Sequence, residues 1–324
     1  MKFFKYPSIE QFRNIIKAVK SQHDYQGKDE DGESIYQHNS PYPTLDFVGT
    51  VKLHGTNAAI VKHKDGNITF QSRERVLTLQ YDNAGFAAAM LGCNLDFLFE
   101  GIEFKEYIAV YGEWCGGNIQ AGIALNQLPK MFVIFGIKID GEWKQVPASL
   151  HSEEQRIFNI YQFPTYPISI DFNQPELAQN KLIEMTLEVE KECPVGKYFG
   201  VSGVGEGIVF TAVNNHNFKF KSKGEKHSVS KVKTLNSIDV ESLQEINEFV
   251  DYAVTENRLQ QGLDWVKTNI SQTPEAKHTG DFIRWIVNDV YKEEEDTIVK
   301  NKLDVKKINA AIPKKAKEWF FNNI

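Results

Sequence analysis

The sequence has only three cysteines in 324 residues, and none lies close to another. Cys93, Cys115 and Cys193 form no CxxC pair, so neither a disulfide framework nor a zinc site is indicated. No apolar run approaches the length of a membrane span. The first residues show no hydrophobic stretch followed by a small-residue cleavage site, so no signal peptide is expected. We therefore expect a protein of the reducing cytoplasm with no membrane partner.

The sequence also lacks an excess of positive charge, because its formal net charge at pH 7 is −6. Any site for nucleic acid must therefore be a local basic groove, since no global positive field exists. The sequence contains no internal repeat and no low-complexity tract. Its hydrophobic content of 41% and charged content of 25% are typical of a globular protein, and its length allows two domains.

The pattern of apolar residues divides the chain near residue 235. We predict strands at residues 45–52, 57–63, 68–72, 107–114, 131–139, 143–146, 207–212 and 217–221. We predict helices at residues 7–20, 81–99, 150–161 and 176–193, with Ser8 capping the first, and a long loop at residues 21–43. Beyond residue 237 a period of 3.6 predicts helices at residues 240–270, 279–292 and 294–321. The fold class is therefore α+β, with domains at 1–234 and 235–324.

Lys52 ends one strand pattern, and apolar residues resume after Asn57. We interpret this stretch as strand, turn, strand. A charged lysine costs free energy if it is buried there. An amine that acts as base or nucleophile explains it, because burial and cationic neighbours lower the pKa of a lysine. The alternative is a hairpin with a surface lysine whose stem covers apolar residues.

Four further clusters lie in the strand-rich part. They read FQSRER at 70–75, VYGEWCGG at 110–117, GVGEGIVF at 203–210 and FKFKSK at 218–223. Strand alternation places Lys219, Lys221 and Lys223 on one face. Taken singly, the clusters also fit a solvated arginine, turn glutamates and an edge strand. Together they supply an amine, the carboxylates Glu113 and Glu206, and several cations, which is a set suited to activating a triphosphate.

In order and type, the clusters resemble the motifs of the covalent nucleotidyltransferases, the superfamily of DNA ligases, RNA ligases and mRNA capping enzymes. The segment KLHGTN at 52–57 is similar to the nucleophile motif, and His54 in place of aspartate is typical of the T4 RNA ligase 2-like branch, which seals nicks in double-stranded RNA. The later motifs match Arg73, Tyr111-Gly-Glu113, the aromatic segment 132–136, Glu206, and Lys221 with Lys223. The resemblance covers roughly residues 1–230.

The resemblance implies an adenylyltransferase domain of antiparallel sheets with flanking helices at 1–234 and an RNA-binding helical domain at 235–324. It implies ATP as substrate, Mg²⁺ or Mn²⁺ as cofactor, and RNA with 3′-hydroxyl and 5′-phosphate ends, as in a nicked duplex, as partner. Lys52 would take AMP from ATP, the AMP would pass to the 5′-phosphate, and the 3′-hydroxyl would then displace it. The expected protein is a monomeric RNA ligase that acts in RNA repair.

The resemblance also implies a role for each matching residue. The catalytic residues are Lys52, Glu206, Lys221 and Lys223. The nucleotide is bound by Leu53, His54, Asn57, Arg73, Glu113, Phe135, Glu206, Lys221 and Lys223. The metal or its water shell is held by Glu113 and Glu206, and the RNA end is recognised by Tyr6 and Gln120. In the helical domain, Lys314, Lys315, Lys317 and Trp319 either contact RNA or form a solvated helix face.

Two positions depart from the motifs. Gly136 follows Phe135 where aspartate is usual, and Ser72 precedes Arg73 where the branch often has a basic residue. The sequence also has no Arg-x-Asp-Lys element of an oligonucleotide-binding domain, which argues against capping. The alternatives are a DNA ligase, a guanylyltransferase, a non-catalytic RNA-binding module on a ligase scaffold and a lysine Schiff-base enzyme.

Overall fold

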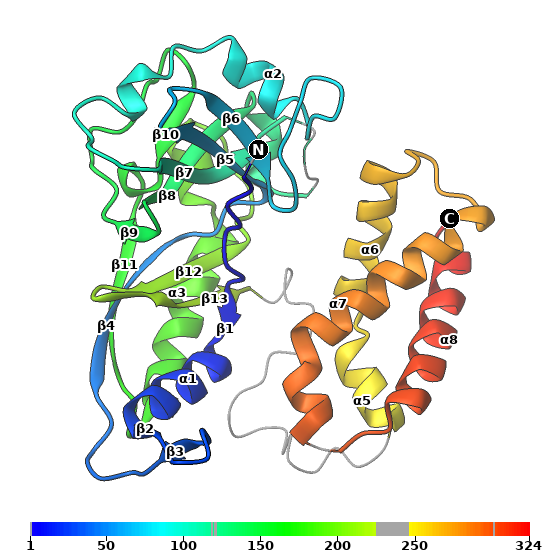
Figure 1. Cartoon of the computed structure of the whole chain (residues 1–324). Helices are drawn as coiled ribbons and strands as arrows, with labels where there is room; N and C mark the ends of the chain where they lie inside the picture. Colours follow the sequence, from blue (N-terminus) through cyan, green and yellow to red (C-terminus); the bar gives the residue numbers. More distant parts are fainter. Residues whose placement is uncertain (1, 118, 120–121, 225–245, 301) are drawn as a thin grey trace. The chain divides into compact units, whose positions relative to one another are not determined.

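The chain contains two compact units, Met1–Ser222 and Lys223–Ile324, in a computed structural model that describes residues 2–117, 119, 122–224, 246–300 and 302–324 (Figure 1). The first unit carries the sheets, and the described part of the second unit is helical. The domain boundary expected between residues 234 and 235 lies outside the described residues. The α+β fold class is confirmed, with antiparallel sheets, flanking helices and a helical C-terminal region.

One sheet of the first unit has five strands in the order β1-β13-β12-β4-β11. The strands are β1 (Glu10–Gln11), β4 (Thr44–Val51), β11 (Thr165–Asp171), β12 (Gly207–Ala212) and β13 (Asn215–Lys223). Strand β4 pairs antiparallel with both β11 and β12, whereas β1 joins β13 in parallel. Phe47, Phe210 and Phe220 of this sheet are fully buried in one apolar core with residues of α1 (Phe12–Asp24) and α3 (Gln179–Lys191).

The second sheet has the strand order β10-β8-β7-β5-β6, with β9 paired to β8. Its strands are β5 (Gly55–His63), β6 (Ile68–Ser72), β7 (Tyr107–Cys115), β8 (Met131–Ile139), β9 (Glu142–Lys144) and β10 (Ile157–Asn159). Strand β7 lies between β5 and β8 and is antiparallel to both. Its residues are nearly all buried, so it forms the centre of this sheet.

Shorter elements complete the first unit. They are the hairpin strands β2 (Tyr25–Lys28) and β3 (Ser34–Tyr36), the helices α2 (Phe86–Leu91) and α4 (Pro194–Tyr198), and the 3-10 turns η1 (Asp96–Leu98), η2 (Ala124–Gln127), η3 (Ile160–Gln162) and η4 (Pro175–Ala178). Phe86 of α2 is fully buried against the second sheet, where its ring meets those of Trp114 and Phe132.

The second unit is built from amphipathic helices. These are α5 (Ile246–Ala253), α6 (Glu256–Asn269), the 3-10 turn η6 (Ala276–His278), α7 (Thr279–Lys300) and α8 (Val305–Asn323). Phe249, Phe282 and Phe320 are fully buried in a core shared by these helices. The unit therefore has an apolar core of its own, as expected for a separate domain.

The best-predicted elements are strands in the two sheets. Residues 68–72, 131–139 and 207–212 form β6, β8 and β12 with the predicted bounds. The turn predicted at Asp65 and Gly66 is also present, because Gly66 has a φ of +84° between β5 and β6. Short segments rich in apolar residues beside clear turn signals are therefore sufficient to locate these strands.

The N-terminal prediction was wrong in two respects. The helix predicted at residues 7–20 begins at Phe12, after Gln11 pairs with β13, and continues to Asp24. Ser8 is therefore not its cap, and the N-cap residue Gln11 makes no capping bond through its side chain. The long loop predicted at residues 21–43 contains the β2–β3 hairpin, which alternation did not reveal.

Three predicted helices were too long or of the wrong type. Residues 81–99 contain only α2 and η1, since Gly85, with a φ of +79°, precedes α2 and Gly92 follows it. Residues 150–161 form β10 and η3 instead of a helix, and β11 and α4 were not predicted. The helix predicted at 240–270 is divided at Thr255, whose side chain accepts the Arg258 N–H as the N-cap of α6.

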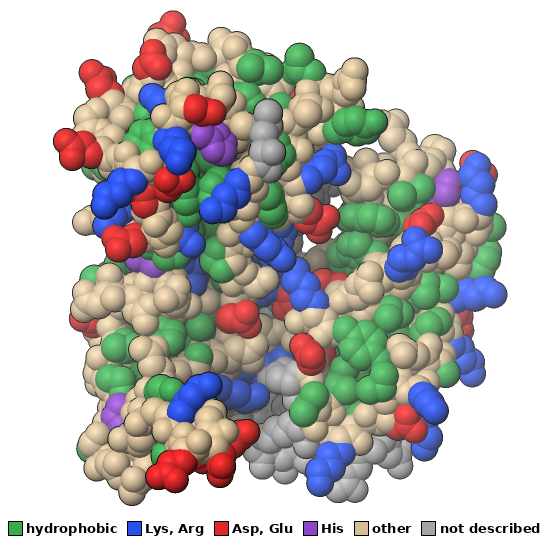
Figure 2. All heavy atoms as spheres, in the orientation of Figure 1, with side chains coloured by type: hydrophobic (Ala, Val, Ile, Leu, Met, Phe, Trp, Pro, Cys, Tyr) green, Lys and Arg blue, Asp and Glu red, His purple; other side chains and the backbone are tan. Residues whose placement is uncertain are grey.

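The surface carries charged side chains of both signs. On the face drawn in Figure 2, acidic and basic side chains are interspersed over each unit. Among the described residues, no helix combines the length and the apolar character needed to cross a membrane.

Candidate active site

Lys52 lies where the chain passes from the first sheet to the second. It follows β4 directly, and β5 begins three residues later at Gly55. The Lys52 N–H donates to the Gly207 carbonyl at 2.8 Å, which extends the antiparallel pairing of β4 with β12 beyond Val51 and Ile208. Lys52 is thereby fixed beside the first residue of β12, which Glu206 immediately precedes.

The amine of Lys52 is paired with Glu206. Lys52 Nζ lies 2.6 Å from Glu206 Oε2, and His54 Nδ1 lies 3.3 Å from the same oxygen. Glu206 is only 4% exposed, so its charge has lost most of its water and depends on these neighbours. Strand pairing has thus brought together two motifs that are far apart in the sequence.

Glu113 is the second carboxylate of the site and comes from the other sheet. Its Oε1 accepts the Gly55 N–H at 3.1 Å, and in the strand register it lies opposite Asn57 of β5. A β-bulge at Tyr111 and Gly112 immediately precedes Glu113, and such bulges redirect side chains near functional sites. A Cβ on Gly55 would lie 2.3 Å from the Trp114 carbonyl oxygen, so only glycine fits there.

The pKa of Glu113 depends on its burial and on the charges around it. Burial raises the pKa of Glu113 to about 7, the positive charge of Lys52 opposes that rise, and the negative charge of Glu206 adds to it. The Gly55 N–H and the Arg73 guanidinium also favour the ionised carboxylate. A carboxyl group whose pKa is near neutrality can exchange a proton or take up a cation at physiological pH.

Tyr6 and Lys219 add a buried polar pair. Lys219 is 7% exposed, and its Nζ donates to the Tyr6 hydroxyl at 2.7 Å. Burial lowers the Lys219 pKa to about 8, and the amine also lies 5.3 Å from the centre of the Trp143 ring. The charges of Glu113 and Arg73 act on the Tyr6 hydroxyl, so the pair lies within electrostatic reach of these two side chains. Lys219 was not predicted as a site residue, although its alternation with Lys221 was a usable signal.

The aromatic motif contains one core ring and one accessible ring. Phe132 is fully buried and packs on Phe86, whereas Phe135 is partly exposed and meets the Tyr6 ring edge-on at 5.0 Å. Gly136 leaves room for an indole, because a Cβ there would lie 3.2 Å from Cζ3 of Trp143. Trp143 thus approaches the backbone at the position where the motif usually has aspartate.

Comparison with known families decides the assignment. A family model described as RNA ligase matches residues 45–233, which is more than half of the chain. The chain belongs to the RNA ligase family. The matched residues include Lys52, Glu113, Glu206 and Lys219. The family membership agrees with the ordered motifs, while the branch within the family is a separate question.

Among solved structures, several of the RNA ligase of Naegleria gruberi match part of this chain. A mutant in its apo form has 19% sequence identity and a TM-score of 0.44, and the match covers 68% of this chain and 55% of that chain. A mutant with AMP and Mn has 17% identity and a TM-score of 0.43, with 68% and 56% covered. A mutant with ATP and Mn has 17% identity and a TM-score of 0.42, with 67% and 55% covered. The aligned region thus spans little more than half of those proteins. No match is found among curated protein sequences.

Three further residues of this RNA ligase family member were predicted to bind the nucleotide. Arg73 is partly buried just after β6, and its Nη2 donates to Ser8 Oγ at 3.4 Å. The Leu53 side chain is 6% exposed and belongs to the apolar core of the first sheet, so only its backbone can face a nucleotide. Asn57 is partly buried on β5.

The final lysine motif and the predicted end-recognition residue are less well defined. Lys221 and Lys223 are partly buried on β13, and Lys221 lies opposite Gln11 of β1. Gln120 lies outside the described residues. The roles of these three residues stay predictions.

Glu113→Gln is expected to change the pH dependence of stability. In the folded protein this carboxyl has a pKa of about 7, against an ordinary value of 4.5. Its ionisation therefore costs stability progressively as the pH rises between these values. In urea unfolding without added metal, the variant should gain about 1 to 3 kcal/mol relative to the wild type between pH 5 and pH 8.

The matched control for this measurement is Glu154→Gln, which removes an exposed carboxylate elsewhere. It should follow the wild-type pH dependence. If the free energy of unfolding changed with pH equally in Glu113→Gln and the wild type, the pKa of Glu113 would be the same in the folded and unfolded protein.

Proposed function

We propose that this protein is an ATP-dependent RNA ligase that joins RNA 3′-hydroxyl and 5′-phosphate ends through a lysyl-AMP intermediate. The supporting observation is the contact of 2.6 Å between Lys52 Nζ and Glu206 Oε2, next to the second carboxylate, Glu113. A reactive amine beside two carboxylates suits transfer of a nucleotidyl group from a metal-bound triphosphate. Membership of the RNA ligase family gives this chemistry its substrate class.

The proposed reaction has three steps. Lys52 Nζ, after losing a proton, attacks the α-phosphorus of ATP, and the bond to pyrophosphate breaks as the N–P bond forms. The AMP then passes from Lys52 to the 5′-phosphate of an RNA end, which restores the lysine. The 3′-hydroxyl of the adjoining strand finally attacks that phosphate, releasing AMP and forming the phosphodiester.

Lys52 must lose a proton before it can attack phosphorus, but the ion pair with Glu206 stabilises the ammonium form. The residues fit Mg²⁺ or Mn²⁺, since Glu206 and Glu113 provide the hard oxygen donors that these ions prefer. Such an ion would neutralise the carboxylates and the phosphate charge. Glu206 and Glu113 would hold the ion or its water shell, which would weaken the attraction of Glu206 for the protonated Lys52.

The surrounding residues have distinct proposed roles. Phe135 stacks on the adenine, because its ring is the accessible one of the aromatic motif. Arg73 contacts the ribose or a phosphate, and Lys219, Lys221 and Lys223 offset phosphate charge. Contacts with the nucleotide are completed by His54, Asn57 and the backbone of Leu53.

The finer proposal is the nick-sealing, T4 RNA ligase 2-like branch, with Tyr6 and Gln120 recognising the RNA end. We assign ligation to the domain at 1–234 and propose that the helical domain at 235–324 contacts RNA. Within that helical domain Lys315 already pairs with Asp251 at 2.8 Å, and the Trp319 Nε1–H donates to Glu256 at 2.7 Å. Lys314 and Lys317 are both exposed, so we propose them first for phosphate contacts, although Lys317 Nζ also lies 5.9 Å from the centre of the Phe321 ring.

A role in RNA repair as a monomer in the cytoplasm completes the proposal. The free thiols of Cys93, Cys115 and Cys193 support a reducing compartment. The alternatives from related chemistry are a DNA ligase and a guanylyltransferase, and the alternative without catalysis is an RNA-binding module.

Incubation with α-labelled ATP and Mg²⁺ tests the proposed activity. We expect covalent labelling of the protein from ATP and none from GTP, and sealing of a 3′-hydroxyl/5′-phosphate nick in duplex RNA. Nicked duplex RNA should be joined at least about 10-fold faster than loose single strands, because the duplex holds the reacting ends together.

Different outcomes identify the alternatives. Labelling from GTP would indicate a guanylyltransferase, and preference for a DNA 3′-hydroxyl would indicate a DNA ligase. No label from either nucleotide would leave a binding module or a lysine Schiff-base enzyme. Equal rates on nicked duplexes and single strands would reject the nick-sealing branch.

A further inference from the structure

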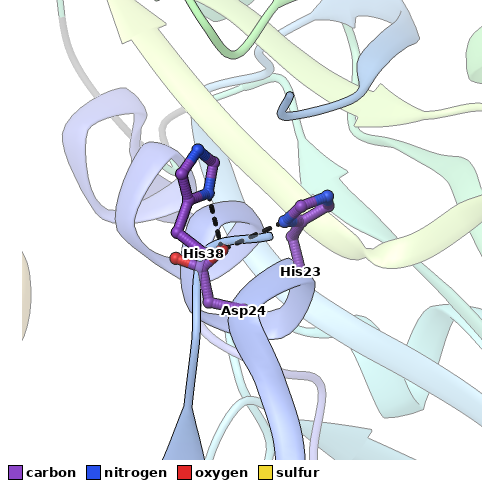
Figure 3. A group of neighbouring side chains, drawn as sticks. All are labelled: His23, Asp24 and His38. Atoms are coloured by element: carbon purple, nitrogen blue, oxygen red, sulfur yellow. Dashed lines mark hydrogen bonds and ion pairs between the residues drawn. The ribbon is translucent and has the colours of Figure 1, made fainter. Parts of the chain in front are cut away.

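Two histidines and an aspartate meet at the C-terminal end of α1, outside the set of residues proposed for ligation. His23 and Asp24 are the last two residues of α1, and His38 follows β3 (Figure 3). The β2–β3 hairpin separates them in the sequence and returns the chain to the end of α1, where the Gln37 N–H donates to the Asp24 carbonyl at 2.7 Å. The hairpin therefore builds the cluster.

The side chains converge on one carboxylate oxygen. His23 Nδ1 and His38 Nδ1 each lie 3.0 Å from Asp24 Oδ1 (Figure 3). One ligand atom from each of the three residues lies within 4.8 Å of the others. Ligands bound to tetrahedral zinc at about 2.0–2.1 Å are themselves about 3.3 Å apart, so these side chains need only small shifts to surround an ion.

We propose that His23, Asp24 and His38 bind one divalent transition-metal ion of the zinc class, with a fourth position open to water. Imidazole nitrogen and carboxylate oxygen are common zinc ligands, and three protein ligands suffice when water completes the tetrahedron. The two imidazoles disfavour Mg²⁺, which prefers oxygen ligands. The site thus selects a different ion from the one proposed at Glu206.

Neighbouring side chains hold two of the three ligands in the required orientation. Ser40 Oγ lies 3.1 Å from His23 Nε2, so it can accept that N–H and leave Nδ1 as the metal ligand. The Tyr42 hydroxyl donates to Asp24 Oδ2 at 3.1 Å, which leaves Oδ1 facing the histidines. Partners of this kind, bonded to the far side of each ligand, are typical of protein metal sites.

The proposed ion would stabilise the β2–β3 hairpin. Nearly every residue of β2 and β3 is exposed, and an isolated two-stranded hairpin is only marginally stable in water. An ion held by α1 on one side and by His38 on the other would fasten this hairpin to the helix. The ion therefore replaces the apolar contacts that the hairpin lacks.

Zinc binding by the purified full-length chain tests the proposal. Titration with Zn²⁺ against a chromophoric chelator, in excess Mg²⁺ to fill sites made only of oxygen, should show one tight site per chain. His38→Ala, which removes a half-exposed side chain, should weaken binding by about 100-fold or more. Substitution with Co²⁺ should give tetrahedral visible absorption bands in the wild type and none in His38→Ala.

His151→Ala is the matched control, because His151 belongs to a different segment and its ring bonds to the Ala148 carbonyl, away from the three proposed ligands. It should bind zinc like the wild type. Circular dichroism and covalent labelling with ATP should be normal in both variants, which separates this test from that of the proposed ligase. Absence of tight binding in the wild type, or equal binding in His38→Ala, would overturn the proposal.

Discussion

Replacement of Lys52 by alanine is expected to abolish formation of the covalent adenylate, with a loss of at least about 1,000-fold. The reason is the position of this amine: Lys52 Nζ lies 2.6 Å from the Glu206 carboxylate, where the chain passes from one sheet to the other. The measurement is the amount of label from α-labelled ATP that stays with the protein on a denaturing gel.

Lys52→Arg separates charge from nucleophilicity in the same assay. A guanidinium preserves the positive charge facing Glu206 but does not lose its proton near neutral pH, so it cannot attack phosphorus. We expect a folded protein without adenylate. Lys64→Ala, which removes an exposed lysine paired with Glu106, is the control and should label normally. Persistent labelling of Lys52→Ala would assign the nucleophile to another residue.

The second large effect is expected for Glu206→Gln. This variant keeps the size of a side chain that is 4% exposed and removes its charge, so it weakens the hold on Lys52 and on a divalent cation without leaving a cavity. Adenylate formation should fall by about 100-fold or more, and the Mg²⁺ concentration for half-maximal activity should rise.

Glu192→Gln provides the matched comparison, because Glu192 is a surface carboxylate paired with the exposed Lys197. It should retain wild-type activity and metal dependence. If Glu206→Gln kept its cooperative unfolding transition and formed adenylate like the wild type, the catalytic role of this carboxylate would be refuted.

The strands that carry the site were predictable because their sequence signals are local. Apolar segments beside an Asp-Gly turn or a glycine gave β6, β8 and β12 their bounds, and these strands belong to the same sheets as the motifs. The motifs occur at strand ends, so locating the strands also located Lys52, Glu113 and Glu206. The order of the strands within each sheet was not accessible from such signals, since pairing is a long-range property.

The incorrect predictions of secondary structure have local physical causes. Residues 81–99 are rich in helix-forming alanine, leucine and methionine, but the glycines at 85 and 92 confine α2 to six residues. Residues 157–159 are all buried where β10 pairs with β8, and such a short buried strand resembles a helix segment. The β2–β3 hairpin is polar and exposed, so it gave no hydrophobic pattern.

Two features of the site depend on tertiary contacts that a sequence does not show. Lys219 shares its strand face with Lys221, but only the folded chain shows that its amine is buried against Tyr6 and Trp143. Gly136 departs from the usual aspartate, and the structure accounts for the glycine by the indole packed over it. The His23, Asp24 and His38 cluster was missed because a hairpin interrupts its spacing.

Because Lys52 lies on the link between the two sheets, the geometry of the site depends on the integrity of both. One sheet contributes Glu206 and Lys219, the other contributes Glu113 and Phe135, and the amine belongs to the link between them. Loosening of either sheet therefore separates the groups before the whole unit unfolds. Adenylate yield measured during gradual heating should decline ahead of the loss of helical signal, so labelling would report the integrity of this junction more sensitively than bulk spectroscopy.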